Sequence, residues 1–254
     1  MEQYRPTGFR ILPPVVKNII IINVLLYLAA KAFESAFKIN LTDTLGMHYF
    51  GSEKFRPYQI ITYMFMHGGF GHIFFNMFAV WMFGNVLENY WGPKRFLFYY
   101  MVTGIGAILI QMLITYLQIS NLELKMSQEQ INSVLSEGYN AFQQGKNFAD
   151  PQMGKLNLLY NIPTVGASGA IFGVLLAFGM LFPNSLIYVY FAIPIKAKWF
   201  VIIYGAIELY SGIANNPGDN VAHFAHLGGM LFGIILILYW KKRFKGGNNN
   251  STFT

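Results

Sequence analysis

The sequence contains no cysteine among its 254 residues, which excludes a disulfide scaffold, a thiolate nucleophile and a cysteine-ligated zinc site. Charged residues are also scarce. They make up 11% of the chain, whereas a soluble domain carries about 25%, and 54% of the residues are hydrophobic. This composition excludes a disordered chain, a collagen-like repeat and an ordinary soluble enzyme. It predicts a protein that crosses a membrane several times.

Four long segments contain no Asp, Glu, Lys or Arg: residues 68–87, 96–118, 156–195 and 220–240. A helix that spans the hydrocarbon core needs roughly 20 apolar residues. The segment 156–195 is about twice that length and is interrupted at Pro183-Asn184, so we expect one helix, then a turn and an apolar approach to the next helix. The predicted fold is an all-α membrane protein, a bundle of six transmembrane helices over residues 13–36, 68–87, 96–118, 167–182, 197–213 and 222–242.

The net charge of +7 would suggest a nucleic-acid partner in a soluble protein, but here the cations flank apolar segments. We therefore expect them to face lipid headgroups and to set the orientation. Of the 18 Lys and Arg residues, 11 fall on the side of both termini, which predicts that both termini are cytoplasmic. The loops 37–66 and 119–160 then lie outside.

The predicted organisation has three parts. Residues 1–12 form a cytoplasmic N-terminus, residues 13–243 the helical core, and residues 244–254 a disordered cytoplasmic tail. The first apolar segment lacks a small-residue cleavage site, so it predicts a retained helix rather than a signal peptide. The loop 119–160 contains the polar run SQEQINSVLSEGYNAFQQG, which is typical of a short surface helix. We expect an integral protein of the bacterial inner membrane, with its site open to the extracytoplasmic side.

Strongly polar side chains inside the predicted spans are costly to bury in lipid, so each is a functional candidate. The second span carries His72 and Asn76 four residues apart, hence on one helical face. The fourth begins with Ser168 between small residues, and the sixth carries His223 and His226 one turn apart. All three helices run with their N-terminal ends outward. These groups therefore lie in the outer half of the membrane and can converge on one cavity.

Each of these residues alone has a simpler structural explanation. A single intramembrane serine usually bonds its own helix, an asparagine joins helices, a histidine packs, and a GASG pattern brings helices together. Their conjunction at one depth favours a site. Glycines on the fourth and sixth helices would bring the backbones close enough for a Ser–His hydrogen bond of about 2.6–3.2 Å. These are Gly169, Gly173, Gly229 and Gly233.

Three motifs resemble those of the rhomboid intramembrane serine proteases: HGGFGHIFFN in the second span, GASGAIFG in the fourth and AHLGGMLFG in the sixth. They occur in the family's order, and the resemblance covers about residues 10–243. It implies a six-helix bundle that hydrolyses a peptide bond in or beside the transmembrane segment of a membrane-protein substrate. The implied partners are such substrates and the lipid bilayer. No cofactor, metal or nucleic acid is expected.

The resemblance also implies roles for individual residues. Ser168 matches the nucleophile and His226 the base of a Ser–His dyad that has no Asp orienter. His72 and Asn76 match the pair that supports the oxyanion, with the backbone N–H of Ser168 as a further donor. The residues expected to support the site are Gly166, Gly169, Phe172, Gly229, Gly233 and His67.

The sequence departs from the family pattern at two places. Where the family often has a Trp-Arg pair in the first outer loop, this chain has Pro57-Tyr58-Gln59. Where some members stack a Tyr on the catalytic His, this chain has Phe172, which retains the stacking ring and lacks the hydroxyl. Without a carboxylate partner, we expect packing to fix the tautomer of His226.

The start of the fourth helix predicts how water reaches Ser168. A helix over 167–182 is about 23 Å long at 1.5 Å per residue, so it begins below the outer surface. The preceding NIPTVGA must then be irregular backbone at membrane depth, which is tolerated only beside a watery cavity. We expect His67, at the mouth of the second span, to complete the water path.

The fifth span is short and polar and contains Glu208, so it is the candidate for a lateral gate. The alternative explanation is that Glu208 reaches the outer interface or bonds a neighbouring helix. Two other functions also stay open. A catalytically silent rhomboid-like protein would bind transmembrane helices without cleaving them. A small proton-coupled transporter would use the histidines as a relay, but the sequence lacks the paired halves that such proteins commonly show.

Overall fold

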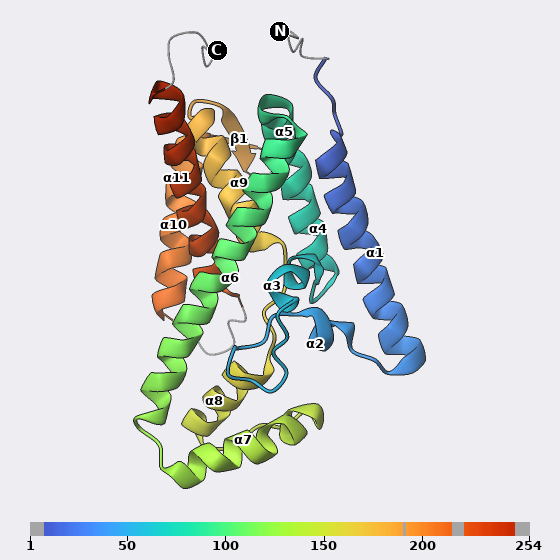
Figure 1. The fold of residues 1–254 in the computed structure, drawn as a ribbon, viewed down its shortest axis with the longest axis vertical. Coiled ribbons are helices and arrows are strands. Elements are labelled where there is room, and N and C mark those ends of the chain that lie inside the picture. Colours follow the sequence, from blue (N-terminus) through green and yellow to red (C-terminus); the bar gives the residue numbers. More distant parts are fainter. Residues whose placement is uncertain (1–7, 190–191, 215–220, 247–254) are drawn as a thin grey trace.

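The computed structural model describes residues 8–189, 192–214 and 221–246. Long helices run roughly side by side, and both ends of the described chain lie at the same end of the bundle (Figure 1). The elements are α1 (Pro14–Phe37), α2 (Leu41–Leu45), α3 (Gln59–Thr62), η1 (Tyr63–Phe65), α4 (Phe70–Ala79), η2 (Val80–Gly84), α5 (Asn85–Trp91), α6 (Pro93–Glu123), α7 (Gln128–Gln143), α8 (Pro151–Asn161), α9 (Ser168–Leu181), β1 (Leu186–Val189), β2 (Ile193–Lys196), α10 (Ala197–Ala214) and α11 (His223–Gly246).

The protein is an all-α multi-pass membrane protein. Within the described residues, five helical segments are long and apolar enough to cross a membrane: Pro14–Phe37, Phe70–Trp91, Pro93–Glu123, Ala197–Ala214 and His223–Lys242. The second combines α4, the single π-helical turn η2 and α5. The remaining predicted span, the fourth along the chain, is α9, which is apolar but has only 14 residues.

Helix α9 lies at the centre of the bundle, where it packs against α6, α10 and α11. Most of its side chains are buried, which explains why its sequence is apolar on all faces. At about 1.5 Å per residue it is about 21 Å long, shorter than the hydrocarbon core of about 30 Å. Figure 1 shows that it begins partway along the bundle, as the sequence predicted.

Glycines set the distance between the central helices. A Cβ on Gly229 of α11 would overlap the backbone carbonyl of Gly169 of α9, so these two backbones touch. Gly173 and Gly233 were expected to bring the same two helices together, and this prediction is wrong in part. Gly173 faces Thr103 of α6, and Gly233 faces the Tyr99 hydroxyl as well as a side chain of α9. A periodic glycine pattern predicts close approach but not which neighbour approaches.

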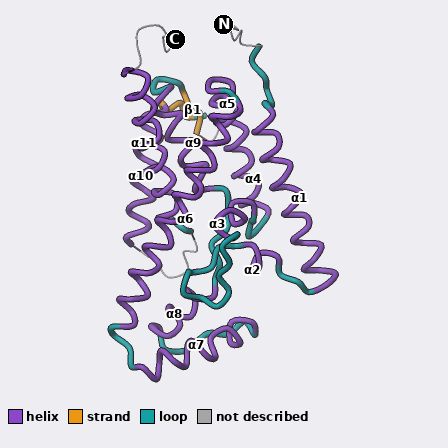
Figure 2. Tube along the Cα trace, in the orientation of Figure 1, coloured by secondary structure: helices purple, strands orange, loops and turns teal. Residues whose placement is uncertain are grey.

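Two short strands follow α9, where the sequence predicted a turn and an apolar approach to the next helix (Figure 2). The apolar segment after Pro183 forms an antiparallel hairpin, with Leu186 paired to Lys196 and Val189 to Ile193. Its β-branched and aromatic residues suit a strand, and the preceding Pro-Asn turn ends α9.

Helix α11 continues to Gly246, so the predicted tail 244–254 begins later than expected. Its residues 247–254 lie outside the described part of the chain.

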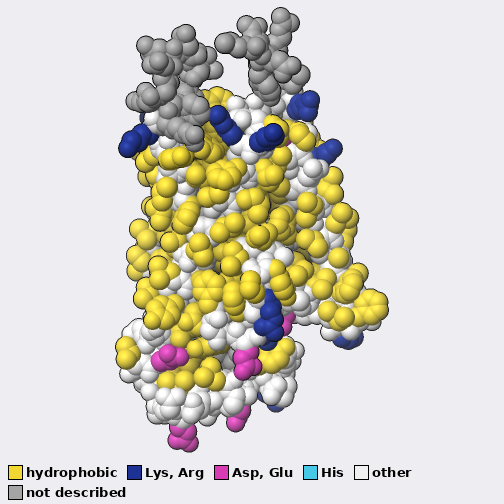
Figure 3. All heavy atoms as spheres, viewed as in Figure 1, with side chains coloured by type: hydrophobic (Ala, Val, Ile, Leu, Met, Phe, Trp, Pro, Cys, Tyr) yellow, Lys and Arg dark blue, Asp and Glu magenta, His cyan; other side chains and the backbone are white. Residues whose placement is uncertain are grey.

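Helices α7 and α8 cover the end of the bundle opposite the termini (Figure 1). Helix α7 is the predicted surface helix, and Ser127 and Gln130 form a capping box at its start. Ile119 of α6, Val134 of α7 and Leu156 of α8 form a small apolar cluster. In Figure 3, Lys and Arg gather near the end that carries the termini and acidic side chains near α7 and α8. The prediction that both termini are cytoplasmic rests on this distribution of Lys and Arg.

The loop 37–66 is held by its own polar contacts. The buried Gln59 amide donates to the carbonyls of Thr44 and Lys54, and its oxygen accepts from the Arg56 N–H at 3.0 Å. Gln59 thus organises the loop at the place where the family often has a Trp-Arg pair.

An ion pair of 3.0 Å joins Lys54 to Asp43 in the same loop. Burial opposes ionisation of Asp43, but hydrogen bonds from His48 and Lys54 outweigh it and hold the pKa of this carboxyl below its ordinary value of 3.8. The charged form of Asp43 therefore stabilises the folded loop.

Candidate active site

Ser168 is the first residue of α9. The irregular backbone before it is hydrogen-bonded to the loop 37–66 at two places. Thr164 and Met47 exchange two backbone hydrogen bonds, of 2.8 and 2.9 Å. The N–H of Gly166 then donates to the carbonyl of Tyr63 at 2.9 Å. This segment therefore has partners for its backbone at membrane depth, and the serine is held at a fixed position.

Gly166 has a backbone conformation that favours glycine, with φ of 123°. A Cβ there would also lie 2.7 Å from Nε2 of His72. Glycine is thus required both by the turn into α9 and by the approach of a histidine from α4.

Ser168 and His226 face each other across the contact between α9 and α11. The distance between Ser168 Oγ and His226 Nε2 is 2.8 Å, a hydrogen bond between two side chains 58 residues apart in the sequence. The close contact of Gly169 with Gly229, one residue past the serine and three past the histidine, brings the two helices together at this point. His226 is 7% exposed and Ser168 is half-buried, so the hydrogen bond is partly shielded by the protein.

The ring of Phe172 lies flat against the imidazole of His226. The ring centroids are 4.1 Å apart and the planes differ by 7°. Phe172 lies one turn beyond Ser168 on α9, so the same helix that carries the hydroxyl also restricts the rotation of the imidazole.

The other nitrogen of His226 contacts a carboxylate. Nδ1 of His226 lies 2.8 Å from Oε2 of Glu208, and Nδ1 of His223 lies 2.6 Å from the same oxygen. An ionised carboxylate only accepts hydrogen bonds, so the contacts with ionised Glu208 fit rings that carry a hydrogen on Nδ1. This leaves Nε2 of His226 as the acceptor for the Ser168 hydroxyl.

The carboxylate is the part of the site that the sequence analysis missed. The expectation that packing alone fixes His226 is wrong, because Glu208 also bonds it. Of the two explanations offered for Glu208, contact with a neighbouring helix is the one observed. The signal was present, since Glu208 is the one Asp or Glu within the fifth span, but its partner depends on how α10 rotates against α11.

Residues of α4 and of the turn before it lie around the serine. His72 lies beside Gly166, and the His67 ring packs edge-on against it with a centroid distance of 5.0 Å. Asn76, one turn further along α4, is buried, and its Nδ2 has no hydrogen-bond partner among the residues that the structure describes. A buried donor without a partner is costly, which is typical of a group that completes its bonds with a ligand.

Glu208, His223 and His226 also have the composition of a metal site. Their ligand atoms lie within 4.8 Å of one another. The two Nδ1 atoms are at hydrogen-bond distance from the carboxylate, which satisfies all three groups without an ion.

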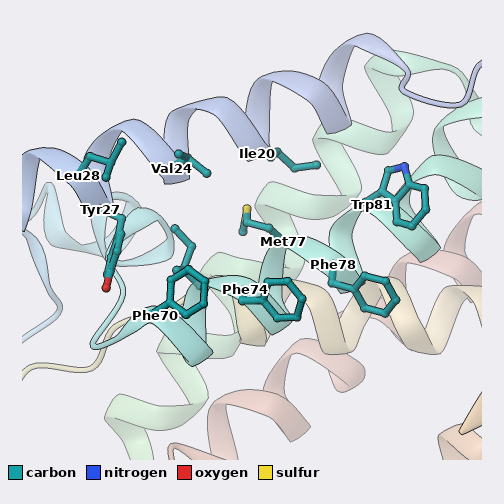
Figure 4. Close-up of a pocket in the computed structure, with 10 residues that line it drawn as sticks. Ile20, Val24, Tyr27, Leu28, Phe70, Phe74, Met77, Phe78 and Trp81 are labelled. Carbon is teal, nitrogen blue, oxygen red and sulfur yellow. The ribbon is translucent and has the colours of Figure 1, made fainter. Parts of the chain in front are cut away.

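An apolar cavity of about 390 Å³ lies between α1 and α4. Figure 4 shows Val24 and Ile20 of α1 facing Phe74, Met77 and Trp81 from the second span. The lining contains none of the candidate catalytic residues. Its apolar lining is compatible with contact to the acyl chains of the surrounding lipid.

A family model for the rhomboid domain matches residues 54–243, which include all of the elements just described from α3 to the last turns of α11. The chain belongs to the rhomboid family. The curated relatives that the chain matches carry rhomboid names. The chain is 28% identical over 185 residues to Rhomboid protein 1, mitochondrial, of Saccharomyces cerevisiae. It is 24% identical over 232 residues to RHOMBOID-like protein 12, mitochondrial, of Arabidopsis thaliana.

A third relative is Rhomboid-like protein 11, chloroplastic, of Arabidopsis thaliana, with 26% identity over 226 residues. The matches cover 72%, 91% and 86% of this rhomboid chain, respectively. They cover 42%, 59% and 62% of the relatives. The chain thus spans about half the length of the curated relatives it matches.

Proposed function

We propose that this rhomboid-family chain is an intramembrane serine endopeptidase that cleaves peptide bonds in or near the transmembrane segments of membrane proteins. The observation that carries the proposal is the 2.8 Å hydrogen bond between Ser168 and His226 at a helix start inside the bundle. A serine hydroxyl is a weak nucleophile until an adjacent base takes its proton. The imidazole of His226 lies at hydrogen-bond distance from this hydroxyl, which supports the proposal that it acts as the base.

The proposed reaction begins with the attack of Ser168 Oγ on the substrate carbonyl carbon. The hydroxyl proton passes to Nε2 of His226, and negative charge develops on the carbonyl oxygen. His226 then gives the proton to the leaving amine as the C–N bond breaks, which leaves an acyl ester on Ser168. Water, activated by the same imidazole, hydrolyses the ester.

The negative charge on the carbonyl oxygen requires donors that are already in place. The Asn76 amide is the strongest candidate, because its buried Nδ2 has no partner within the described part of the chain. The ring of His72, beside Gly166, and the backbone N–H of Ser168 are the other two. The first N–H groups of a helix lack partners within the helix, so the N–H of Ser168 is available at the start of α9.

The decisive experiment uses the purified protein in detergent or vesicles. A fluorophosphonate probe should label the wild type and should not label Ser168→Ala, and a panel of transmembrane substrates should be cleaved by the wild type alone. Labelling of Ser168→Ala at another serine would refute the assignment. An unreactive wild type that still binds transmembrane helices would instead support the catalytically silent alternative.

The protein is an integral membrane protein, and we propose a site that opens to the side opposite the termini. The predicted bacterial inner membrane is a separate proposal. The names of the three relatives place those proteins in mitochondria or chloroplasts, so none of these relatives supports a bacterial location. Fractionation of the source cells with antibodies to the chain would test it.

A further inference from the structure

Glu208 is carried by a helix that is otherwise mostly exposed. Only 17% of the membrane-spanning window of α10 is buried inside the protein, and its buried residues are Ala197, Val201 and Glu208. The first two lie near the start of the helix, next to the hairpin. Glu208 is 5% exposed and lies about two turns beyond Val201, beside the first turn of α11. A carboxylate at this depth is costly unless it is paired.

The contacts of Glu208 give it a chemical role. Its Oε2 accepts from Nδ1 of His226 at 2.8 Å, while Nε2 of the same ring lies 2.8 Å from Ser168 Oγ. Serine, histidine and glutamate therefore form one continuous chain of hydrogen bonds across α9, α11 and α10. A carboxylate in this position fixes the tautomer and the orientation of the imidazole and stabilises the imidazolium that forms during attack.

We propose that Glu208 is a positioning residue for catalysis, so that the site is a Ser168–His226–Glu208 triad rather than a dyad. This inference rests on the proposed peptidase function. The proton that leaves Ser168 Oγ stays on Nε2 of His226 until the leaving amine takes it. The Nδ1 proton stays on the ring, and the carboxylate remains ionised throughout. No further reactant is needed.

His223 acts on the carboxylate rather than on the serine. Its Nδ1 donates to the same Oε2 at 2.6 Å, so it helps to hold Glu208 against α11. Because Glu208 belongs to α10, the alignment of His226 depends on the contact of α10 with α11. A displacement of α10 would remove the carboxylate from the imidazole.

The test compares Glu208→Gln with Glu88→Gln in the full-length protein. Glu88 is a matched control, because it is also a buried glutamate, 2% exposed, and its oxygens accept from the backbone N–H groups of Val15 and Val16 far from the site. Glu208→Gln should lower kcat by about 10²–10⁴-fold, with KM nearly unchanged, because an uncharged partner no longer stabilises the imidazolium. Glu88→Gln should lower the melting temperature and leave kcat near that of the wild type.

Two further variants separate positioning from packing. Glu208→Asp, which keeps the charge, should recover part of the lost kcat. Glu208→Ala should be partly rescued by added formate, which supplies a carboxylate to the vacated space. A merely structural glutamate would give neither result.

Several outcomes would overturn the proposal. A wild-type kcat in Glu208→Gln, or a loss that only follows the melting temperature, would make Glu208 a packing residue. A raised KM with unchanged kcat would assign it to substrate entry. Loss of wild-type activity on chelation, restored by zinc, would assign Glu208 and both histidines to a metal. In each of these cases the wild type still cleaves substrate, so the peptidase proposal stands. That proposal fails only if the wild type itself is inactive.

Discussion

The contact between Gly169 and Gly229 predicts how one substitution changes the distance between Ser168 and His226, on which the proposed catalysis depends. Gly229→Ala adds a Cβ that would overlap the carbonyl of Gly169, and neither backbone can yield without moving a helix. Displacement of α11 by about 1 Å is the least that relieves such an overlap, and overpacking of this kind costs about 1–3 kcal/mol. The protein should fold with a lower melting temperature.

The displacement acts directly on the Ser168–His226 hydrogen bond that we propose for catalysis. A shift of about 1 Å along the line between the helices takes the Ser168–His226 distance from 2.8 Å to about 3.8 Å, beyond hydrogen-bond reach. A misplacement of that size costs about 10²-fold in rate. We therefore expect both kcat and fluorophosphonate labelling in Gly229→Ala to fall by about this factor.

The assay is substrate turnover and probe labelling at a temperature where thermal melting shows the variant to be folded. Gly205→Ala is the matched control, because its added Cβ would meet only the flexible end of Met230 at 3.1 Å. It should keep most of the activity. A folded Gly229→Ala protein with wild-type kcat would refute the reasoning that this contact sets the distance between the serine and the histidine.

Four further predictions test other parts of the protein. Asn76→Ala should lower kcat by about 10²–10³-fold with little change in KM, as for the loss of one oxyanion donor, and a raised KM alone would make Asn76 a substrate-binding residue. His223→Ala should retain much more turnover than His226→Ala in the same assay, and the reverse order would show that the wrong histidine was assigned as the base. Cysteines introduced at Asn132 and Lys242 of this cysteine-free chain should react with an impermeant thiol reagent from opposite sides of sealed vesicles; labelling from one side would contradict the helix count. The stability contributed by the Asp43 carboxylate is present above about pH 3.8, its ordinary pKa, and is lost as the pH falls through the lower folded value. Asp43→Asn should therefore lower the melting temperature at pH 7 and have less effect near pH 3, and an equal loss at both would contradict the ionic role.

The sequence determined the class of the protein and most of its helices. Long uncharged segments can span lipid only as helices, because the backbone must satisfy its own hydrogen bonds there. The predicted limits of α1, α10 and α11 therefore agree with the structure to within a few residues at most ends. The motif around Ser168 and the spacing of His72 and Asn76 also follow from local chain order, since residues four apart share a helical face.

Tertiary structure decided which of these residues meet. Helix rotation and depth bring Glu208 to Nδ1 of His226, and an error of one residue in the rotation of α10 would turn the carboxylate by about 100° away from it. The same limit explains why Gly173 faces α6 instead of α11. The segment after Pro183 is apolar enough for either a buried helix or a strand. It forms a hairpin because β1 pairs with β2, the strand before α10. Periodicity fixes the faces of a helix, but the packing of the other helices fixes what each face contacts.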